Sequence, residues 1–392
     1  MPDDIKSSED KNNQTDLSQN YMAVKAAPPE EPTSQSPSSA KPKKTRRVNI
    51  TKKQKIILGV SAILIVALSI GGMIIFGSNK PDPQPQTITQ TKPEPVKTTE
   101  PSRLTGLEVN PEINKRTVTG IMIENSPDAR PQSGLKDAGI IYEAVAEGGI
   151  TRFLALFQDT QPEYVGPVRS VRPYYLDFIT PYDAGIAHVG GSPVALEQIR
   201  QQKLKDLNQF FNPGPFWRER TRYAPHNMYT NVVKLKELEK QKGWKASEYK
   251  TLLRGEESKP ADIITAKNIN IIMSSTLYNV SYEYDKTTNS YLRSEGGKPH
   301  KDFKSNKQLA PKIVVVPVIP RTQDGIYSVY AINGSGKVLV FQNGTVTEGT
   351  WKKSGRKDQF TFTKKDGTPL KLAAGQTWIT IAATSANISY KP

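Results

Sequence analysis

The strongest constraint on this chain is an uncharged apolar run from Ile56 to Phe76. The run holds 21 residues, 13 of them Ile, Leu, Val or Phe, and a helix needs about 20 apolar residues to cross a bilayer. Residues 41–55, directly before it, carry eight Lys or Arg and no acid. Because positive charge stays on the cytoplasmic side, the pattern predicts one transmembrane helix over Ile56–Phe76. The N-terminus is expected on the cytoplasmic side of the cytoplasmic membrane and the rest of the chain outside the cell.

Two other structures are compatible with an apolar run, a cleaved signal peptide and a buried core helix. A signal peptide has a short basic start, an apolar core of about 7–15 residues and a cleavage site between small residues. Here some 55 residues precede the run, and the run itself is too long. The sequence therefore favours an uncleaved signal anchor.

Composition excludes several kinds of chemistry. The chain has no cysteine, so a disulfide, a thiolate metal site, a cysteine nucleophile and a cysteine-linked lipid are not expected. With only three histidines, no metal site is expected, and no cofactor is predicted. The net charge is +16, but eight positive charges flank the predicted helix, where they serve topology and contact anionic lipid. Nucleic acid is therefore not an expected partner, whereas anionic envelope polymers and lipid head groups are.

Four composition shifts divide the chain. Residues 1–55 form a basic cytoplasmic tail with the composition of a disordered segment, and residues 77–103 form a Pro/Thr/Lys-rich linker, an extended spacer. Residues 104–258 read as an α+β domain with a layered mixed sheet and helices, and residues 259–392 as a smaller, mostly β domain. The predicted fold class is thus α+β in two outer domains behind one transmembrane helix.

Local patterns place the elements of both outer domains. Ser192 and Pro193 have the residue types of a helix N-cap and first helical position, and Asn343-Gly344 is typical of a two-residue hairpin turn. Helices are expected at residues 172–180, 193–202 and 230–242. Strands are expected at residues 118–124, 140–146, 153–157, 185–189, 270–273, 280–284, 291–293, 312–318, 326–332, 338–342, 345–351 and 377–382.

Five phrases between Glu124 and Tyr229 combine Gly or Pro with charged residues: ENSPDARPQSG, YEAVAEGGITRF, GPVRSVRPYY, HVGGSP and APHNMY. Two more follow near the end, GKVLVFQNGTVTEGTWKKSG and DGTPLKLAAGQTWITI. In this order they resemble the YerB-type bacterial envelope proteins, over about residues 104–392. The resemblance implies an extracytoplasmic, membrane-associated protein with an α+β N-terminal and a small β C-terminal domain. Many relatives are attached as lipoproteins, and the predicted helix would replace that lipid here. The resemblance implies no reaction.

Four arginines stand in these phrases: Arg130, Arg152, Arg169 and Arg172. The planar guanidinium suits two-point binding of carboxylate or phosphate, so they could clamp a carboxylated glycan or a lipid-linked pyrophosphate. If Arg169 and Arg172 are helical, they share one face. The alternative is a set of structural ion pairs with acids of the same region: Glu143, Glu147, Asp177 and Asp183.

Candidate catalytic groups lie in the same phrases. Glu147 is the candidate general acid for glycoside cleavage, with Glu143 on the same strand face and His188 or Asp183 assisting. The alternative for Glu147 is a structural partner of Arg152. A Ser192–His188 nucleophilic pair is less favoured, because Ser192 already fits an N-cap and GGSP is not a nucleophile elbow.

Further ligand-binding candidates are Ser192, His226, Asn227 and Tyr229, which lie in loops after strands, where sites are common. Aromatics nearby, such as Trp217 and Tyr223, could stack on sugar rings or simply pack. The expected function is a membrane-anchored envelope protein that binds a cell-wall or other anionic component through an arginine-rich cleft. The alternative is an envelope enzyme acting on peptidoglycan glycan or a lipid-linked pyrophosphate glycan, and the sequence leaves open whether any reaction is catalysed.

Overall fold

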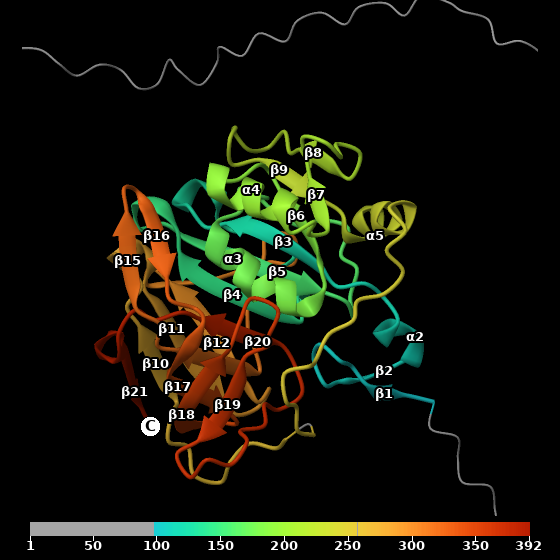
Figure 1. Ribbon diagram of the computed structural model, residues 1–392. Helices are drawn as coiled ribbons and strands as arrows, with labels where there is room; N and C mark the ends of the chain where they lie inside the picture. The colour runs from blue at the N-terminus through green and yellow to red at the C-terminus, as the bar shows by residue number, and fades with distance from the viewer. Residues whose placement is uncertain (1–97, 257) are drawn as a thin grey trace, which may run out of the picture. The chain divides into compact units, whose positions relative to one another are not determined.

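The computed structural model describes residues 98–256 and 258–392 (Figure 1). The predicted tail, the predicted transmembrane helix and most of the linker lie outside these residues. Within them, no helix is long and apolar enough to cross a membrane. The described residues form one compact unit.

A ten-stranded mixed sheet organises this unit. Its strands, in the order in which they lie side by side, are β19 (Thr361–Lys364), β18 (Thr345–Lys353), β17 (Gly334–Gln342), β14 (Ile313–Pro317), β20 (Thr377–Thr380), β4 (Ile140–Val145), β5 (Thr151–Phe157), β3 (Thr119–Glu124), β6 (Gly185–His188) and β7 (Asp206–Asn208). The pairs β14–β20, β20–β4, β3–β6 and β6–β7 are parallel. Strands from both predicted outer domains share the sheet, because β20 lies between β14 and β4.

A smaller antiparallel sheet is built from the C-terminal part of the chain. Its strands in order are β13 (Lys298–Pro299), β12 (Ser290–Glu295), β11 (Val280–Asp285), β10 (Asn268–Ile271) and β21 (Ile388–Lys391). Three two-stranded hairpins complete the strands: β1 (Glu100–Pro101) with β2 (Glu108–Val109), β8 (Phe216–Arg218) with β9 (Met228–Thr230), and β15 (Arg321–Asp324) with β16 (Tyr327–Tyr330).

In the described part of the chain, four short α-helices begin where the sequence supplies a cap or a proline. They are α2 (Pro111–Asn114), α3 (Pro173–Ile179), α4 (Pro193–Gln201) and α5 (Val232–Gln241). Ser192 caps α4 by accepting a hydrogen bond from the Ala195 amide, as predicted. Asn231 caps α5 by accepting from the Lys234 amide.

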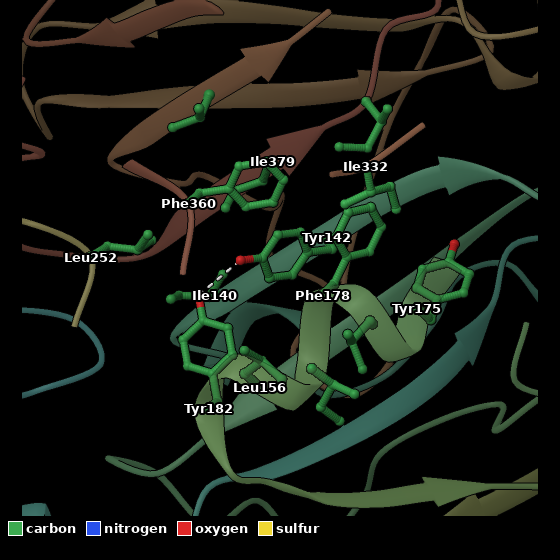
Figure 2. Packing of buried hydrophobic residues seen from close by; sticks show 14 of the residues in the cluster. Ile140, Tyr142, Leu156, Tyr175, Phe178, Tyr182, Leu252, Ile332, Phe360 and Ile379 are labelled. Carbon is green, nitrogen blue, oxygen red and sulfur yellow. Dashed lines mark hydrogen bonds between the residues drawn. The ribbon is translucent and has the colours of Figure 1, made fainter. Parts of the chain in front are cut away.

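The central strands of the large sheet, β14, β20, β4, β5, β3 and β6, are buried on both faces. The alternation of side chains assigns each of their residues to one face. On β4, Ile140 and Tyr142 face the core beneath α3, whereas Ile141 joins the core on the opposite face with Trp378. Figure 2 shows the first core, where the Tyr142 ring stacks on Phe178 at 4.8 Å between ring centroids. A third core lies between the smaller sheet and the β14–β17 part of the large one.

The structure confirms the α+β class, the large mixed sheet and the smaller C-terminal β region. Asn343 and Gly344 connect β17 to β18 with φ of 57° and 78°, the left-handed conformations that a type I′ hairpin turn requires. One strand is displaced from its predicted range, because β10 spans Asn268–Ile271 rather than residues 270–273. The short strands that were not predicted lie at sheet edges or in two-stranded hairpins: β1, β2, β7, β8, β9, β13, β15, β19 and β21.

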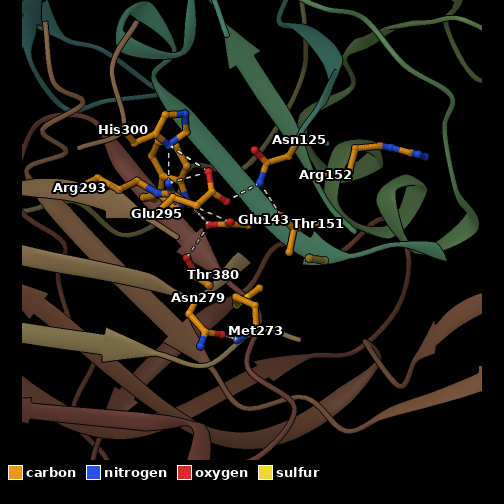
Figure 3. Close-up of polar contacts among 12 residues, drawn as sticks. Asn125, Glu143, Thr151, Arg152, Met273, Asn279, Arg293, Glu295, His300 and Thr380 are labelled. Carbon is orange, nitrogen blue, oxygen red and sulfur yellow. Dashed lines mark hydrogen bonds and ion pairs between the residues drawn. The ribbon is translucent and has the colours of Figure 1, made fainter. Parts of the chain in front are cut away.

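A buried ion pair joins the two sheets. Arg293 on β12 donates from Nη2 to both carboxylate oxygens of Glu143 on β4, at 2.8 and 2.9 Å, and both side chains are 0% exposed. Trp378 donates from Nε1 to the same carboxylate at 2.8 Å, and its ring lies 4.4 Å from the Arg293 guanidinium carbon. Figure 3 shows Arg293 reaching Glu143 from the smaller sheet. Thr380 adds a third donor, its hydroxyl at 3.3 Å from Glu143 Oε2. Hydrogen bonds from these three residues compensate for the loss of water around the carboxylate.

We expect Arg293→Ala to lower the free energy of unfolding by about 3–5 kcal/mol, because it leaves the Glu143 carboxylate buried without its cation. Arg220→Ala, at an exposed position, is the control and should change stability by less than about 0.5 kcal/mol. Urea unfolding followed by circular dichroism measures both. A double variant, Arg293→Met with Glu143→Gln, should lose less than Arg293→Ala. Equal losses for the single and double variants would contradict the ion-pair account.

Candidate functional site

Three neighbouring parallel strands, β3, β6 and β7, end at one edge of the large sheet, here called the carboxyl edge. The loops that follow them are residues 125–134, 189–193 and 209–227. Strand β5 runs in the opposite direction and therefore begins at this edge. Ligands in sheets of parallel strands bind outside the carboxyl ends. The Gly- and Pro-containing charged segments between Glu124 and Tyr229 thus lie where a binding site is expected.

Glu147 lies at the carboxyl edge in the turn between β4 and β5, where it binds two arginines. Arg172 donates from Nε to Oε2 at 2.9 Å and from Nη2 to Oε1 at 2.5 Å. Arg152 donates from Nη2 to Oε1 at 2.8 Å. The remaining Nη1 groups of the two arginines donate to backbone carbonyls of Val171 and Ser170. Arg152 and Arg172 are therefore already occupied by a carboxylate of the same chain.

The same contacts keep Glu147 ionised. Burial by itself would raise the pKa of this carboxyl, but the charge of Arg152 and the hydrogen bonds from Arg172 outweigh burial and lower the pKa to about 2. A general acid must hold its proton at the working pH. This geometry does not support the general-acid role considered for Glu147 and favours its alternative, a structural ion pair. Glu143, the predicted neighbour on the same strand face, points instead into the sheet interface toward Arg293.

Arg169 and Arg172 do not share a helix face, which corrects the conditional expectation from their spacing. Arg172 is extended, with φ −125° and ψ 156°, and α3 begins only at Pro173. A residue before proline is disfavoured in the helical region, so the proline fixes the start of the helix. The two arginines consequently reach different acids.

Arg169 approaches a second carboxylate, that of Glu124 at the end of β3. Its Nε lies 3.3 Å from Glu124 Oε1, which also accepts from Ser126 Oγ at 2.9 Å and from His226 Nδ1 at 2.9 Å. His226 Nε2 then faces Asp128, whose Oδ2 is 3.9 Å away. Glu124 is buried, whereas the side chains of Arg169 and His226 are 29% and 21% exposed. In the described part of the chain, the two terminal nitrogens of Arg169 have no hydrogen-bond partner.

Arg130 belongs to a different place, the seam between the 125–134 loop and the smaller sheet. It donates to the carbonyl of Leu277 at 2.8 Å and to Asn125 Oδ1 at 3.0 Å. Its Nη2 lies 3.3 Å from Glu295 Oε1, and its guanidinium covers the ring of Tyr278. The four predicted arginines therefore do not form one clamp.

A cavity of about 480 Å³ opens at this seam, here called the seam cavity. Its lining residues are Pro127, Arg130, Pro131, Leu277, Glu295, Gly296, Lys298, Pro299, His300, Lys301 and Asn306. Lys298 and Lys301 are exposed on the smaller-sheet side, while Arg130 stands on the other. The lining of the cavity thus combines apolar side chains with three cations.

Two buried groups lie at the inner side of the seam cavity. Burial raises the pKa of the Glu295 carboxyl, although Asn125 donates to it at 2.5 Å. Burial and the charge of Arg293 hold the pKa of His300 well below its usual range, so this histidine is neutral. Its Nε2 bonds Gln132 at 2.8 Å. Figure 3 shows Glu295 and His300 beside Arg293, so the cavity borders the ion pair that joins the sheets.

The other predicted catalytic residues lie apart from these groups. His188 is fully buried and bonded at both ring nitrogens, to the Gly190 carbonyl at 2.7 Å and to Asp206 at 2.9 Å. Asp183 precedes β6, which pairs with β3 from Gly185 onward, so it lies at the sheet edge opposite Glu124. There it binds Lys205 at 2.8 Å. Ser192 acts as the N-cap described above.

Asn227 and Tyr229 shape the loop rather than face a cavity. Asn227 accepts from Arg218 at 2.7 Å and donates to the carbonyls of Glu219 and Arg222. The Tyr229 ring is buried against Tyr164 at 4.6 Å between centroids. Only His226, among these loop candidates, keeps a partly exposed polar atom at the carboxyl edge.

Sequence reasoning missed Glu124, Glu295, Lys298 and Lys301. The run KPHKDFK from Lys298 was a usable signal, since it places three lysines within seven residues. No local sequence signal pointed to Glu295 or Glu124, because their contacts are with residues distant in sequence. Within the described ranges, no group of three or more His, Asp or Glu is arranged to hold a metal ion.

We expect Glu147→Gln to lower the free energy of unfolding at pH 7 by roughly 2 kcal/mol, discounted for partial exposure. The folded pKa of about 2 lies below the ordinary value of 4.5. The contribution is therefore complete above about pH 4.5 and lost as the pH falls toward 2. Urea unfolding at pH 7, 5 and 3 should show the two proteins converging at low pH. Glu237→Gln, exposed on α5, is the control. A constant difference at all three pH values would contradict the ion-pair account.

Comparison with known proteins agrees with this architecture. Two family models match, the N-terminal domain of the "Protein of unknown function (DUF3048)" family at residues 104–245 and its C-terminal domain at residues 269–379. "Putative lipoprotein YerB" of Bacillus subtilis (strain 168) is 36% identical over 285 residues, which cover 71% of this chain and 85% of that protein. The crystal structure of YerB protein from Bacillus subtilis matches with a TM-score of 0.67 and 32% identity, over 74% of this chain and 99% of that one. The chain therefore belongs to the DUF3048 family, together with YerB.

Proposed function

We propose that this protein is a membrane-anchored extracytoplasmic protein that binds an anionic component of the bacterial envelope in the seam cavity. The anchor is the apolar run Ile56–Phe76 behind its basic flank. The name of the related YerB protein proposes a lipid attachment for that protein. The chain has no cysteine to carry such a lipid, and a single helix would give the same location.

The observation that supports the seam cavity is its combination of concavity and positive charge. Arg130, Lys298 and Lys301 line it from two sides, and none of the three is held in a two-point carboxylate pair. Arg152 and Arg172 differ, since Glu147 already occupies them. A carboxylated or phosphorylated polymer could therefore reach Lys298 and Lys301, and add to the single contact of Arg130 with Glu295.

The apolar part of the cavity lining favours a ligand that also has an uncharged surface. Leu277, Pro127, Pro131 and Pro299 line the space between the cations. Binding pockets commonly combine apolar walls with a few charged groups that fix orientation. The expected ligand is thus an anionic polymer whose repeating unit has an uncharged face, such as a sugar ring, which packs on these prolines.

We expect Lys298→Glu with Lys301→Glu to weaken binding to purified cell-wall sacculi at least about tenfold, because two attractive charges become repulsive. Co-sedimentation of the purified protein with sacculi measures this. Lys234→Glu with Lys240→Glu changes the net charge equally on exposed positions of α5 and should change binding little. Sacculi from which acid has removed the anionic polymers should bind neither the unmodified protein nor the two double variants.

Two outcomes would contradict the proposal. Equal losses for both charge-reversed pairs would mean that net charge, and not the seam cavity, determines binding. Release of soluble fragments from the sacculi, detected by mass and lost in His226→Ala, would instead favour the envelope enzyme. The Glu124–His226 pair would then be the candidate acid–base pair, because Glu124 accepts a hydrogen bond from His226 Nδ1 and the His226 side chain is partly exposed.

The topology has a test of its own. A reporter enzyme that works only outside the cytoplasm, fused after Lys80, should be active, because eight basic residues precede the apolar run. Mass spectrometry of the mature protein should find residues 1–55 still attached. Activity of a cytoplasm-specific reporter at the same position, or cleavage near Gly77, would overturn the anchor.

A further inference from the structure

The segment between β7 and β9, residues 209–225, exposes large aromatic side chains. Phe210 is 67% exposed, Phe211 80% and Tyr223 90%. Figure 1 shows this segment around β8 and β9, at the end of the unit away from β17–β19. Contiguous exposed apolar surface of this kind marks a site of interaction.

The two phenylalanines are held outward by a hydrogen-bonded turn. The carbonyl of Asn208 accepts from the amides of Phe211 and Asn212, at 3.1 and 3.0 Å. The Asn208 side chain accepts from the Phe210 amide at 3.1 Å. The Phe210 ring lies directly over Gly190, where an added Cβ would be 3.4 Å from it. The exposure of these rings is therefore built into the fold.

Another apolar residue stands on the neighbouring loop. Val194 is 57% exposed at the first turn of α4. Because β6 and β7 are adjacent parallel strands, the loops that follow them lie next to each other, as the Phe210–Gly190 contact shows. Val194, Phe210 and Phe211 are together called the apical patch.

Positive charge accompanies the apical patch. Residues 209–225 contain Arg218, Arg220 and Arg222 and one acid, Glu219. Glu219 is engaged by the hydroxyls of Tyr164 and Thr221. Arg218 and Arg220 are exposed. Exposed aromatics beside arginines are the composition that enters the interface of an anionic bilayer.

We propose that the apical patch docks on the surface of an anionic lipid bilayer, with Phe210 and Phe211 entering the head-group region and Arg218 and Arg220 contacting lipid phosphates. The proposal rests on the membrane anchoring in the proposed function. Residues 77–97, if extended, span up to roughly 60 Å, so they keep the unit within reach of the bilayer. Tethering raises the local concentration of the patch at the surface, and weak docking then suffices.

A second copy of the chain fits the apical patch less well. Face-to-face packing of two patches would bring the exposed arginines of both copies together, and like charges across an interface oppose association. Lipid phosphates are complementary to the same arginines. The charge of the segment therefore favours the membrane over self-association.

The test uses the full chain in nanodiscs of phosphatidylcholine with phosphatidylglycerol, or of phosphatidylcholine alone. The absence of native cysteine allows a single environment-sensitive dye at Gly214→Cys, where an added Cβ meets no atom within 4 Å. The control label is Ser354→Cys, an exposed position between β18 and β19. Only the label at position 214 should shift to the blue and be quenched by spin-labelled lipid, and only with phosphatidylglycerol.

Phe210→Ser with Phe211→Ser should reduce this quenching at least about tenfold, and Arg220→Glu should reduce it several-fold. Quenching unaffected by the phenylalanine changes, or equal at positions 214 and 354, would overturn the proposal. So would a phenylalanine-dependent dimer seen by light scattering without docking. Lys298→Glu with Lys301→Glu should leave the aromatic-dependent quenching in place, so failure of the seam-cavity proposal is distinguishable from failure of this one.

Discussion

The rest of the structure depends on the buried pair of Arg293 and Glu143. It is the point where the smaller sheet meets β4 of the large sheet, and both charges are withdrawn from water. Such a pair is specific rather than strongly stabilising, since the cost of desolvation nearly equals the attraction. Its value here is positional. It fixes where β12 lies against β4, and thereby where Glu295, His300 and the seam cavity face the 125–134 loop.

The two polar regions of the molecule differ in how their charges are matched. The Glu147 carboxylate forms ion pairs with both Arg152 and Arg172, so these charges are neutralised within the chain. At the seam the cations outnumber the acids that reach them, and the exposed lysines face solvent. Because the charges around Glu147 are paired within the chain, they stabilise the local backbone conformation. Unpaired positive charge can attract an anionic partner. The proposed binding site is therefore the seam cavity and not the region of Arg152 and Arg172.

Local features of the fold were predictable, whereas contacts across the chain were not. The Asn343-Gly344 turn and the Ser192 cap are decided by residues next to each other, so their patterns sufficed. The helix predicted at residues 172–180 forms as α3, but Arg169 and Arg172 lie before it, because the helix begins only at Pro173. The Arg152–Glu147 pair was one of the predicted alternatives, since only five positions separate the two residues. The acids that Arg172 and Arg293 bind were not predictable in the same way, because Arg172 and Glu147 are separated by 25 positions and Arg293 and Glu143 by 150. Only the order of strands in the sheet brings them together, and no periodicity encodes that order.

The position of β20 in the large sheet has a consequence for how the protein is made. Residues 377–380 fill the gap between β14 and β4, although β4 is synthesised more than 200 residues earlier. Until that late segment emerges, β4 keeps an unpaired edge, which is a template for wrong pairing. If the unit crosses the membrane from its N-terminal side, folding and translocation are coupled in time. The large sheet closes only after residues 377–380 have crossed, so the chain is delivered as an open sheet that β20 then completes.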